Sequence, residues 1–374
     1  MDVALSKPLI EEDDLALMKD ALLSGWLAHG PYNKQFEQAF TAYTGCKHAI
    51  TMNSCTSALF LAVAANNIRG EVVIPSFTFV ATANAVETAG ATCAFADVDY
   101  ATACVTAETI AAALTPRTEA IMVVHYGGQP CVMEPIEQLA RTRGLKLIED
   151  SAETIGGTCH GVKTGARNTG CFSFFPTKNL TTGEGGMYTT NDDAEAQRVR
   201  TLMGHGIASS TYQREKAERP WLRAATMAGY NFRMSNVLAA LGVAQMKKLD
   251  AMNDRRRAIA ARFSAGLALP EIDLPVELPG MHHVYQMYTV KVKGVDRTQF
   301  LRELRGLGIA ASVHFDPPVH TQPYYRDKYP GVKLPVTEQL AETIVTLPMY
   351  PQMTDAEIEA TIAGVQAALA KTRG

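Results

Sequence analysis

Cys171-Phe-Ser-Phe-Phe-Pro-Thr-Lys178-Asn-Leu-Thr-Thr-Gly-Glu-Gly-Gly-Met187 joins an apolar run of strand character to a lysine and a glycine-rich loop. Pro176 stops the run, so Lys178 follows just past a strand end, where α/β folds place their chemistry. The glycines let the backbone pass close to a bound group. A desolvated lysine loses its proton readily and forms Schiff bases with carbonyls. Lys178 is therefore a candidate anchor for pyridoxal phosphate (PLP). The alternative is a solvated lysine on a glycine-rich turn.

Length, charge and cysteine content exclude several classes of protein. The 374 residues suggest two domains. A net charge of −3 does not indicate the positively charged surface that nucleic-acid-binding proteins need. The seven cysteines show no spacing typical of a metal site, so we expect no metal. An odd number of cysteines without the spacing of a disulfide framework indicates reduced thiols in a cytoplasmic protein.

Neither a signal peptide nor a membrane span is expected. Residues 11–14 are all acidic, where a signal peptide needs basic and then apolar residues. The most apolar run, 49–65, is interrupted by polar residues at 53, 54, 56 and 57, so it falls short of a membrane span.

Strand patterns alternate with helical patterns over residues 49–150. We expect strands at 49–52, 71–74, 91–96, 120–124 and 146–150, and helices at 58–65, 78–89, 106–114 and 134–142. Such alternation predicts an α/β fold with a mostly parallel, doubly wound sheet. The first strand is not followed by G-x-G-x-x-G, which disfavours a dinucleotide-binding fold.

Two polar features follow expected strands. Residues 53–57 lead into a helix whose N-terminus offers free N–H groups to an anion, or they form a simple Ser/Thr cap. Asp150 ends its strand, where an acid points into the site crevice of such a sheet, although it could also cap a helix. PLP chemistry needs the pair of Asp150 and Lys178. The carboxylate keeps the pyridine nitrogen protonated, and the lysine holds the aldehyde and moves the proton.

Several segments together carry a family resemblance over nearly the whole chain. The sequence resembles fold-type-I PLP-dependent aminotransferases of the DegT-type sugar aminotransferase family. The supporting segments are Gly30-Pro-Tyr-Asn-Lys-Gln-Phe-Glu37, Asn53-Ser-Cys-Thr-Ser-Ala-Leu59, Pro75-Ser-Phe-Thr-Phe-Val-Ala-Thr-Ala-Asn84, Glu149-Asp-Ser-Ala-Glu153, the stretch from Phe172 to Gly186, and Gly229-Tyr-Asn-Phe-Arg-Met234.

The resemblance implies roles for individual residues. Lys178 would hold PLP and Asp150 would pair with its ring nitrogen. Glu153 falls where the family usually has Gln or His near the ring hydroxyl, and glutamate also occurs there in members resembling GDP-perosamine synthase. Thr56, Ser57 and Ser173 would hold the phosphate. Phe79 would stack on the ring, although an aromatic residue there could equally be core.

The same resemblance implies an obligate homodimer with shared active sites. Asn231 would reach the phosphate of the neighbouring subunit and Arg233 the substrate side of that site. The alternative for this segment is a turn that caps the next helix through Ser235. His314 and His320 are candidate residues at the site rim, or loop histidines without a role.

The second half is expected to be less regular. We expect one long helix over 236–263 with Arg255–Arg257 on a solvated face, a strand at 310–314, a loop at 322–325 and a charged, mobile loop at 212–220. A second helix is expected from Asn33 to Tyr43. The domain prediction is a large PLP-binding α/β domain at 1–250 and a small C-terminal α+β domain at 251–374.

The sequence thus predicts a PLP-dependent aminotransferase. It would transfer an amino group from L-glutamate to a nucleotide-linked keto sugar, of the 4-keto-6-deoxy type, for surface polysaccharide or glycoconjugate biosynthesis. The alternatives are an aminotransferase acting on another sugar or cyclitol ketone, and a non-catalytic regulator on the same fold. A sugar dehydratase of this family is disfavoured, because dehydratases lack the lysine.

Overall fold

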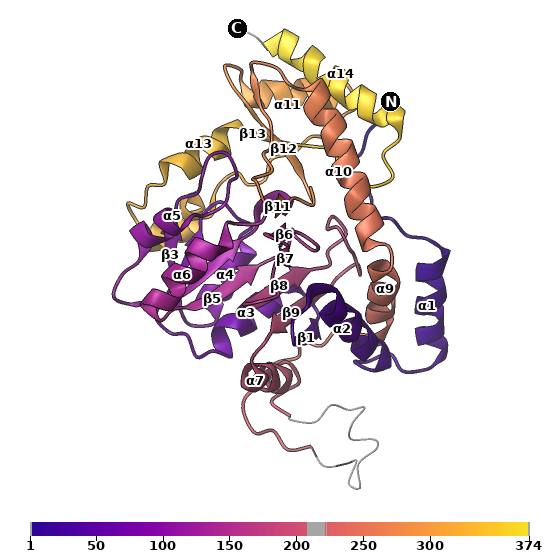
Figure 1. The fold of residues 1–374 in the computed structure, drawn as a ribbon, viewed down its shortest axis with the longest axis vertical. Helices are drawn as coiled ribbons and strands as arrows, with labels where there is room; N and C mark the ends of the chain where they lie inside the picture. The colour runs from indigo at the N-terminus through magenta and orange to yellow at the C-terminus, as the bar shows by residue number, and fades with distance from the viewer. Residues whose placement is uncertain (1, 208–220, 222, 373–374) are drawn as a thin grey trace.

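A seven-stranded sheet forms the centre of the computed structural model, which describes residues 2–207, 221 and 223–372 (Figure 1). Only β9 runs antiparallel to its two neighbours, β1 and β8, so the α/β class and the mostly parallel sheet are confirmed. The strand order is β1 (His48–Met52), β9 (Gly186–Thr190), β8 (Thr169–Ser173), β5 (Lys146–Asp150), β4 (Thr118–Val124), β2 (Glu71–Pro75) and β3 (Thr92–Ala96).

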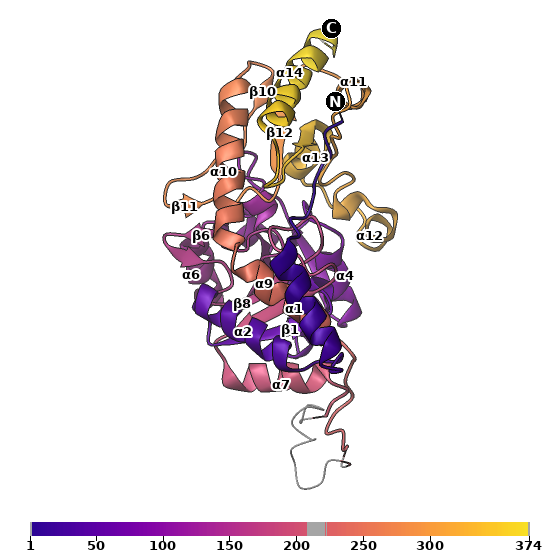
Figure 2. The ribbon, with the colours of Figure 1, turned by 90° about the vertical axis from the view of Figure 1, so that its right-hand side faces the viewer.

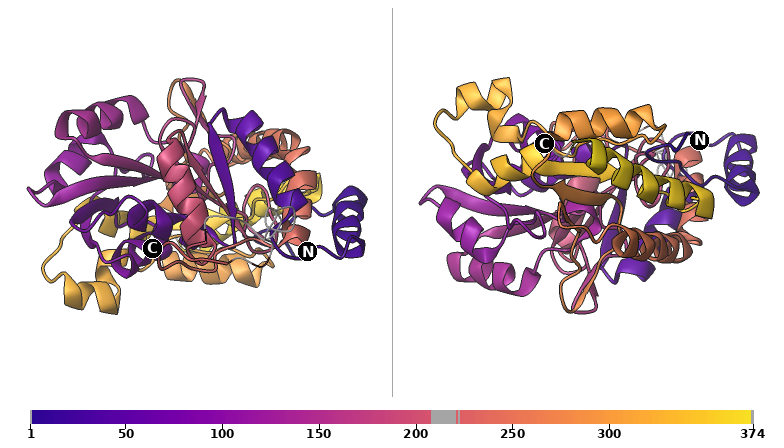
Figure 3. Two further views of the ribbon diagram at one scale, coloured as in Figure 1. Left: turned by 90° about the horizontal axis from the view of Figure 1, so that it is seen from below. Right: turned by 90° about the horizontal axis from the view of Figure 1, so that it is seen from above.

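Helices cover both faces of this sheet (Figure 3, left). Alternation along β2 explains this, because Val72 and Ile74 enter one core and Val73 enters the core on the other side. The first core includes residues of α3 (Cys55–Ala64), α4 (Ala81–Thr88) and α7 (Asp193–Met203), and the second includes residues of α5 (Ala107–Ala113) and α6 (Met133–Arg143). Both faces are therefore buried, which suits strands that are apolar throughout.

Several helices differ in their limits from the prediction, among them α3 and α4, which begin three residues away from their predicted starts at 58 and 78. The second helix, α2, is Pro31–Thr44. Asn33 is its third residue and not its N-cap, and the Asn33 side chain accepts the N–H of the N-cap residue Gly30 at 2.8 Å. The expected long helix is two helices, α9 (Asn236–Met246) and α10 (Leu249–Gly266). The two helices are separated near Lys248, whose amine lies 2.6 Å from Asp14 in the first turn of α1 (Glu12–Leu23) and also pairs with Glu11 and Asp13.

The C-terminal part has its own core. An antiparallel sheet of β10 (Ile272–Asp273), β12 (Tyr288–Val292) and β13 (Ile344–Leu347) packs with α10, α11 (Arg297–Gly306) and α14 (Asp355–Thr372). Val3 belongs to the same core and bridges to Ile309, so the chain start reaches this part of the molecule (Figure 2). The domain boundary after residue 250 stays a prediction.

Three other predictions for this part were wrong. Residues 310–314 form no named strand, and only Ser312 makes a bridge, to Thr346. Residues 323–325 begin a short helix, α12 (Pro323–Lys328), because proline suits the first helical position. Arg256 is buried, not solvated, and its Nη1 donates to the carbonyls of Tyr285, Gln286 and Met349.

A third, small sheet joins β11 (Met281–His282), β6 (Thr158–Cys159) and β7 (Val162–Lys163), and α13 is Pro335–Thr343. The loop expected at 212–220 lies outside the described residues. Within the described part, none of the helices has the length and apolar character needed to cross a membrane.

Candidate active site

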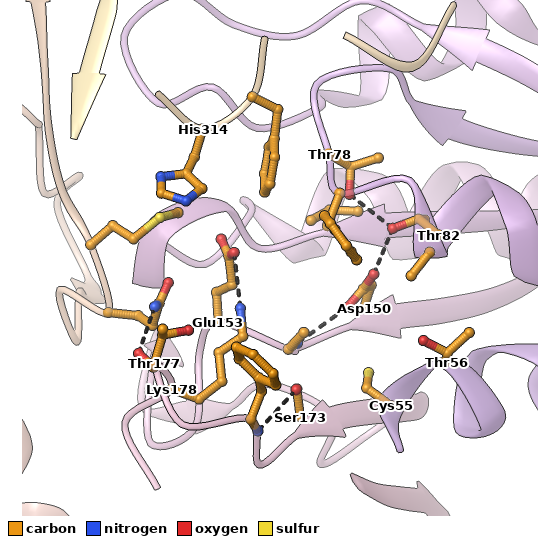
Figure 4. Close-up of a pocket in the computed structure, with 18 of the residues that line it drawn as sticks. Cys55, Thr56, Thr78, Thr82, Asp150, Glu153, Ser173, Thr177, Lys178 and His314 are labelled. Atoms are coloured by element: carbon orange, nitrogen blue, oxygen red, sulfur yellow. Dashed lines mark hydrogen bonds and ion pairs between the residues drawn. The ribbon is translucent and has the colours of Figure 1, made fainter. Parts of the chain in front are cut away.

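A cavity of about 420 Å³ lies where several strands of the main sheet end (Figure 4). Its wall includes Val124, Asp150 and Ser173, the last residues of β4, β5 and β8. The C-terminal part closes it from the other side with residues that include His314 and Met349. The cavity thus occupies the crevice at the carboxyl ends of parallel strands, where such sheets bind ligands.

Lys178 reaches into this cavity from the loop after β8. Its Nζ lies 3.2 Å from Glu153 Oε1, a contact drawn as a dashed line in Figure 4. The Lys178 side chain is 16% exposed. The other Glu153 oxygen accepts the Gly127 backbone N–H at 2.8 Å. Glu153 therefore holds the lysine amine at the cavity wall, and the alternative of a solvated surface lysine is excluded.

Asp150 lies in the same cavity and is held by different groups. The Thr82 hydroxyl donates to its Oδ2 at 2.8 Å, and the Ala152 N–H donates to its Oδ1 at 3.2 Å. The Thr78 and Thr82 hydroxyl oxygens are 2.8 Å apart. Because the Thr82 hydroxyl donates its hydrogen to Asp150, the Thr78 hydroxyl is the donor in this second bond. Burial raises the pKa of Asp150 to about 6, although the Thr82 bond acts in the opposite direction.

The start of α3 forms another part of the wall. Ser54 caps the helix by accepting the Ser57 N–H at 3.1 Å, and Thr56 faces the cavity. The first N–H groups of a helix have no acceptor within it, so they remain available to an anion. Gly186 of β9 packs closely against this turn, because a Cβ there would lie 2.5 Å from the Cys55 nitrogen.

The remaining predicted cofactor residues lie at or near this wall. Ser173 lines the cavity, and its Oγ is 3.4 Å from the Phe175 N–H that donates to it. Ser57 is next to the wall, and its hydroxyl donates to Asn53 at 2.7 Å. Phe79 lines the rim with 61% of its surface exposed and lies near the Phe315 ring, so it is not a core residue.

The two candidate histidines differ in position. His314 lines the cavity, and its Nδ1 lies 2.9 Å from the Thr346 hydroxyl. Burial lowers the His314 pKa, which favours the neutral imidazole. His320 is buried outside the cavity, between the Ser76 hydroxyl at 2.7 Å and Glu338 at 3.2 Å.

Asn231 and Arg233 also lie away from the cavity. Both are partly exposed, and Arg233 Nε donates to Asn231 Oδ1 at 3.0 Å. Arg233 Nη2 lies 3.2 Å from His205 Nε2. The structure therefore does not bring these two residues to the cavity of their own chain.

Sequence reasoning missed Thr78, Thr82 and the Gly127 N–H. The two threonines belong to a quoted segment and are four residues apart, so one turn brings their hydroxyls together. That spacing was the available signal. A backbone N–H such as that of Gly127 leaves no signal, because every residue except proline has one.

The side chains present fit PLP. The cofactor has an aldehyde, a ring nitrogen and a phosphate. The cavity offers an amine on Lys178, a buried carboxylate on Asp150 and, beside Thr56, the N-terminal turn of α3. Each group of the cofactor has a chemically complementary partner, so Lys178 would hold the aldehyde, Asp150 the ring nitrogen and the α3 turn the phosphate.

Comparisons with known proteins agree with this chemistry. The model of the DegT/DnrJ/EryC1/StrS aminotransferase family matches residues 8–366. The aminotransferase TlmJ from Streptoalloteichus hindustanus is 33% identical, with a TM-score of 0.92 and 99% of both chains covered. DesV from S. venezuelae is 32% identical, with a TM-score of 0.88 over 95% of this chain and 94% of that one. The PLP form of Spr1654 from Streptococcus pneumoniae, described as a putative sugar aminotransferase, is 25% identical, with a TM-score of 0.91 and 99% of both chains covered.

Proposed function

Because the chain belongs to the DegT/DnrJ/EryC1/StrS aminotransferase family, we propose that it transfers an amino group from L-glutamate to a nucleotide-linked keto sugar. The chain is an aminotransferase and PLP is its cofactor. The sugar acceptor is supported by the similarity to a putative sugar aminotransferase. The nucleotide link, the 4-keto-6-deoxy type and the glutamate donor rest on the resemblance between the sequence motifs and the family.

The observation that carries the proposal is the placement of Lys178 and Asp150 in one cavity. Bound PLP supplies a sink for the electron pair released when a C–H bond of the donor breaks. In the first half of the reaction Lys178 Nζ would take that proton and deliver it to the cofactor, and in the second half it would move a proton from the cofactor to the acceptor carbon. Asp150 would pair with the ring nitrogen and keep it protonated. Glu153, 3.2 Å from Lys178 Nζ, keeps the amine directed into the cavity.

The cavity itself supports an acceptor that is less polar than an ordinary sugar. Its wall carries many apolar side chains, among them those of Leu5, Phe79, Phe315, Leu347 and Met349. A deoxy carbon leaves a methyl group where a hydroxyl would otherwise need a partner, and an apolar wall accepts the methyl group at lower cost. This favours a 6-deoxy sugar among the keto sugars.

A substrate panel tests this proposal. The PLP-loaded protein is mixed with L-glutamate and, separately, with nucleotide-linked 4-keto-6-deoxy sugars, free keto sugars and cyclitol ketones. We expect amino-sugar product and 2-oxoglutarate in equal amounts, and only with nucleotide-linked acceptors. Turnover with free ketones alone would overturn the proposed substrate. A visible cofactor band that glutamate leaves unchanged would instead indicate a different donor or a regulator.

The shared active site is part of the proposal. The cavity of the described chain does not include Asn231 or Arg233, which are polar, partly exposed and paired with each other. In a dimer with a two-fold axis, the Asn231 and Arg233 side chains of one copy can reach the cavity of the other copy. The axis then repeats the same contact at the second cavity. We therefore extend the proposal to a homodimer in which each copy completes the site of the other.

A further inference from the structure

A second group of ligand-type side chains lies outside the active-site cavity, where α6 meets the β6–β7 hairpin. Glu134 is in the first turn of α6, Cys159 ends β6, and His160 follows in the turn. One potential ligand atom of each lies within 4.8 Å of the other two. We propose that Glu134, Cys159 and His160 bind a divalent transition-metal ion of the zinc type.

The hairpin fixes the position of the imidazole. Cys159 pairs with Val162, so His160 and Gly161 form a two-residue turn, and both have positive φ, 47° and 78°. Asparagine and glycine are the usual residues in such a turn, so a histidine here is unusual. Its backbone N–H donates to the Gly280 carbonyl at 2.8 Å. A Cβ at Gly280 would lie 2.4 Å from His160 Nδ1, so the ring packs directly on that glycine.

The β6–β7 hairpin is also tied to the rest of the fold. β6 pairs with β11 in the small third sheet, next to β7 in Figure 1. Cys159 Sγ lies 3.3 Å from Glu134 Oε2, which links the hairpin to α6. Because all three backbones are held, the three ligand atoms need little movement to close on an ion.

A small cavity of about 10 Å³ lies beside the thiol and carboxylate. That volume is about one water-sized sphere. Its charged wall consists of Glu134, Glu137, Glu149, Lys163 and Arg167. Arg167 pairs with Glu137 at 3.7 Å, and the Lys163 amine lies over the Tyr43 ring, 4.2 Å from its centre. Both cations therefore already have partners, and Glu134 Oε2 accepts the Cys159 thiol, whose hydrogen a bound ion would replace.

The donor set selects the class of ion. Thiolate, imidazole and carboxylate are ligands of zinc and cobalt, whereas magnesium and calcium take oxygen ligands. Three protein ligands leave one tetrahedral position for water. A cysteine binds such a metal ion as the thiolate, so binding releases the thiol proton as the metal–sulfur bond forms, and affinity should increase with pH.

Competition with a chromogenic chelator measures the affinity. Tag-free, PLP-loaded protein is stripped of metal with EDTA and titrated with Zn²⁺ at several pH values. We expect one Zn²⁺ per chain in the wild type. Cys159→Ser should abolish this binding, and Glu134→Gln and His160→Asn should weaken it by at least about tenfold.

Two controls make the test decisive. His160→Asn retains the turn, because asparagine tolerates positive φ, so lost binding cannot be ascribed to a misfolded hairpin. Cys46→Ser removes another buried thiol, one close to His48, and should leave the affinity unchanged. Equal Zn²⁺ affinity in the wild type, Cys159→Ser and His160→Asn would overturn the proposal, as would the absence of stoichiometric binding in the wild type.

Discussion

The cavity wall around Lys178 and the segment 229–234 both carry polar side chains, but they use them differently. In the cavity, Lys178 pairs with Glu153, and Asp150 accepts from Thr82, all within one chain and largely buried. In the segment, Arg233 and Asn231 bond to each other and remain partly exposed. The first region can therefore be tested in a single chain, whereas the role proposed for the second must be tested with two copies of the chain.

The largest effect is expected from Lys178→Ala, which should remove all measurable turnover. Among the described residues that line the cavity, only Lys178 carries an amine, and that amine must both hold the cofactor and move the proton. Lys178→Arg is the control, since it keeps the charge beside Glu153 but not the reactivity. Borohydride treatment of the wild type should attach the cofactor to the peptide that contains Lys178. Attachment to another lysine would contradict the assignment.

Asp150→Asn should cost at least about 100-fold in kcat/KM, because an amide cannot hold the ring nitrogen in its protonated form. Circular dichroism should confirm an unchanged fold. Near-wild-type turnover in this variant would mean that Asp150 is a structural residue at the end of β5. It would then have no role in keeping the cofactor ring protonated.

A mixing experiment distinguishes the two regions directly. Lys178→Ala subunits and subunits with both Asn231→Ala and Arg233→Ala should each be inactive alone. After mixing in equal amounts with random exchange, about one site in four should combine both intact halves, and activity should return to about that fraction of the wild type. Mass spectrometry must verify the heterodimer. A verified heterodimer without activity would place both regions in the same subunit's site.

Removal of PLP should reveal how much the burial of the Asp150 carboxylate lowers the free energy of unfolding. Its pKa is raised from 3.8 to about 6 by burial, so the folded apoprotein binds this proton more tightly than the unfolded chain. The stability associated with this proton is present below about pH 4 and is lost as the pH rises through about 6. Relative to wild type, apo Asp150→Asn should therefore gain up to about 3 kcal/mol of unfolding free energy over that interval, at about 1.4 kcal/mol per pKa unit. Urea unfolding at a series of pH values measures this gain. Parallel pH profiles for the two apoproteins would contradict it.

The smallest effect is expected from Thr82→Val, which keeps the shape but removes the hydroxyl that donates to Asp150. Loss of one hydrogen bond to a charged group should weaken PLP binding about tenfold, as measured by equilibrium dialysis. It should also move the acidic limb of the kcat/KM profile to higher pH, because the Thr82 bond lowers the Asp150 pKa. Thr82→Ser should restore both properties. A serine variant that behaves like valine would indicate a packing role.

The sequence was sufficient to predict the class of the central sheet and to select Lys178 and Asp150, which the structure places in one cavity. Buried strands such as β2 and β4 contain continuous apolar runs, Asp150 is the last residue of β5, and Lys178 lies in the loop after β8. The break between α9 and α10 could not be predicted in this way, because it depends on Lys248 reaching acidic residues more than 200 positions away. The burial of Arg256 likewise depends on carbonyls brought together by distant loops.

For the active site, too, local sequence patterns could not predict contacts between distant residues. A threonine that orients a carboxylate resembles any other helix threonine in sequence, so the spacing of Thr78 and Thr82 could suggest a pair of hydroxyls but not their contact with Asp150. His320 was a candidate because it is a histidine in a loop, yet its ring is occupied by Ser76 and Glu338. Local patterns thus identified residues at strand ends, and tertiary contacts decided which other polar residues belong with them.

The bridge between Val3 and Ile309 has a consequence for how the chain is made. Val3 is almost fully buried in the C-terminal core, and its N–H donates to the Gly308 carbonyl at 2.8 Å. The ribosome makes Gly308 and Ile309 more than 300 residues after Val3. Until those residues have been made, Val3 lacks its final contacts. This part of the C-terminal core can therefore close only after synthesis has passed Ile309.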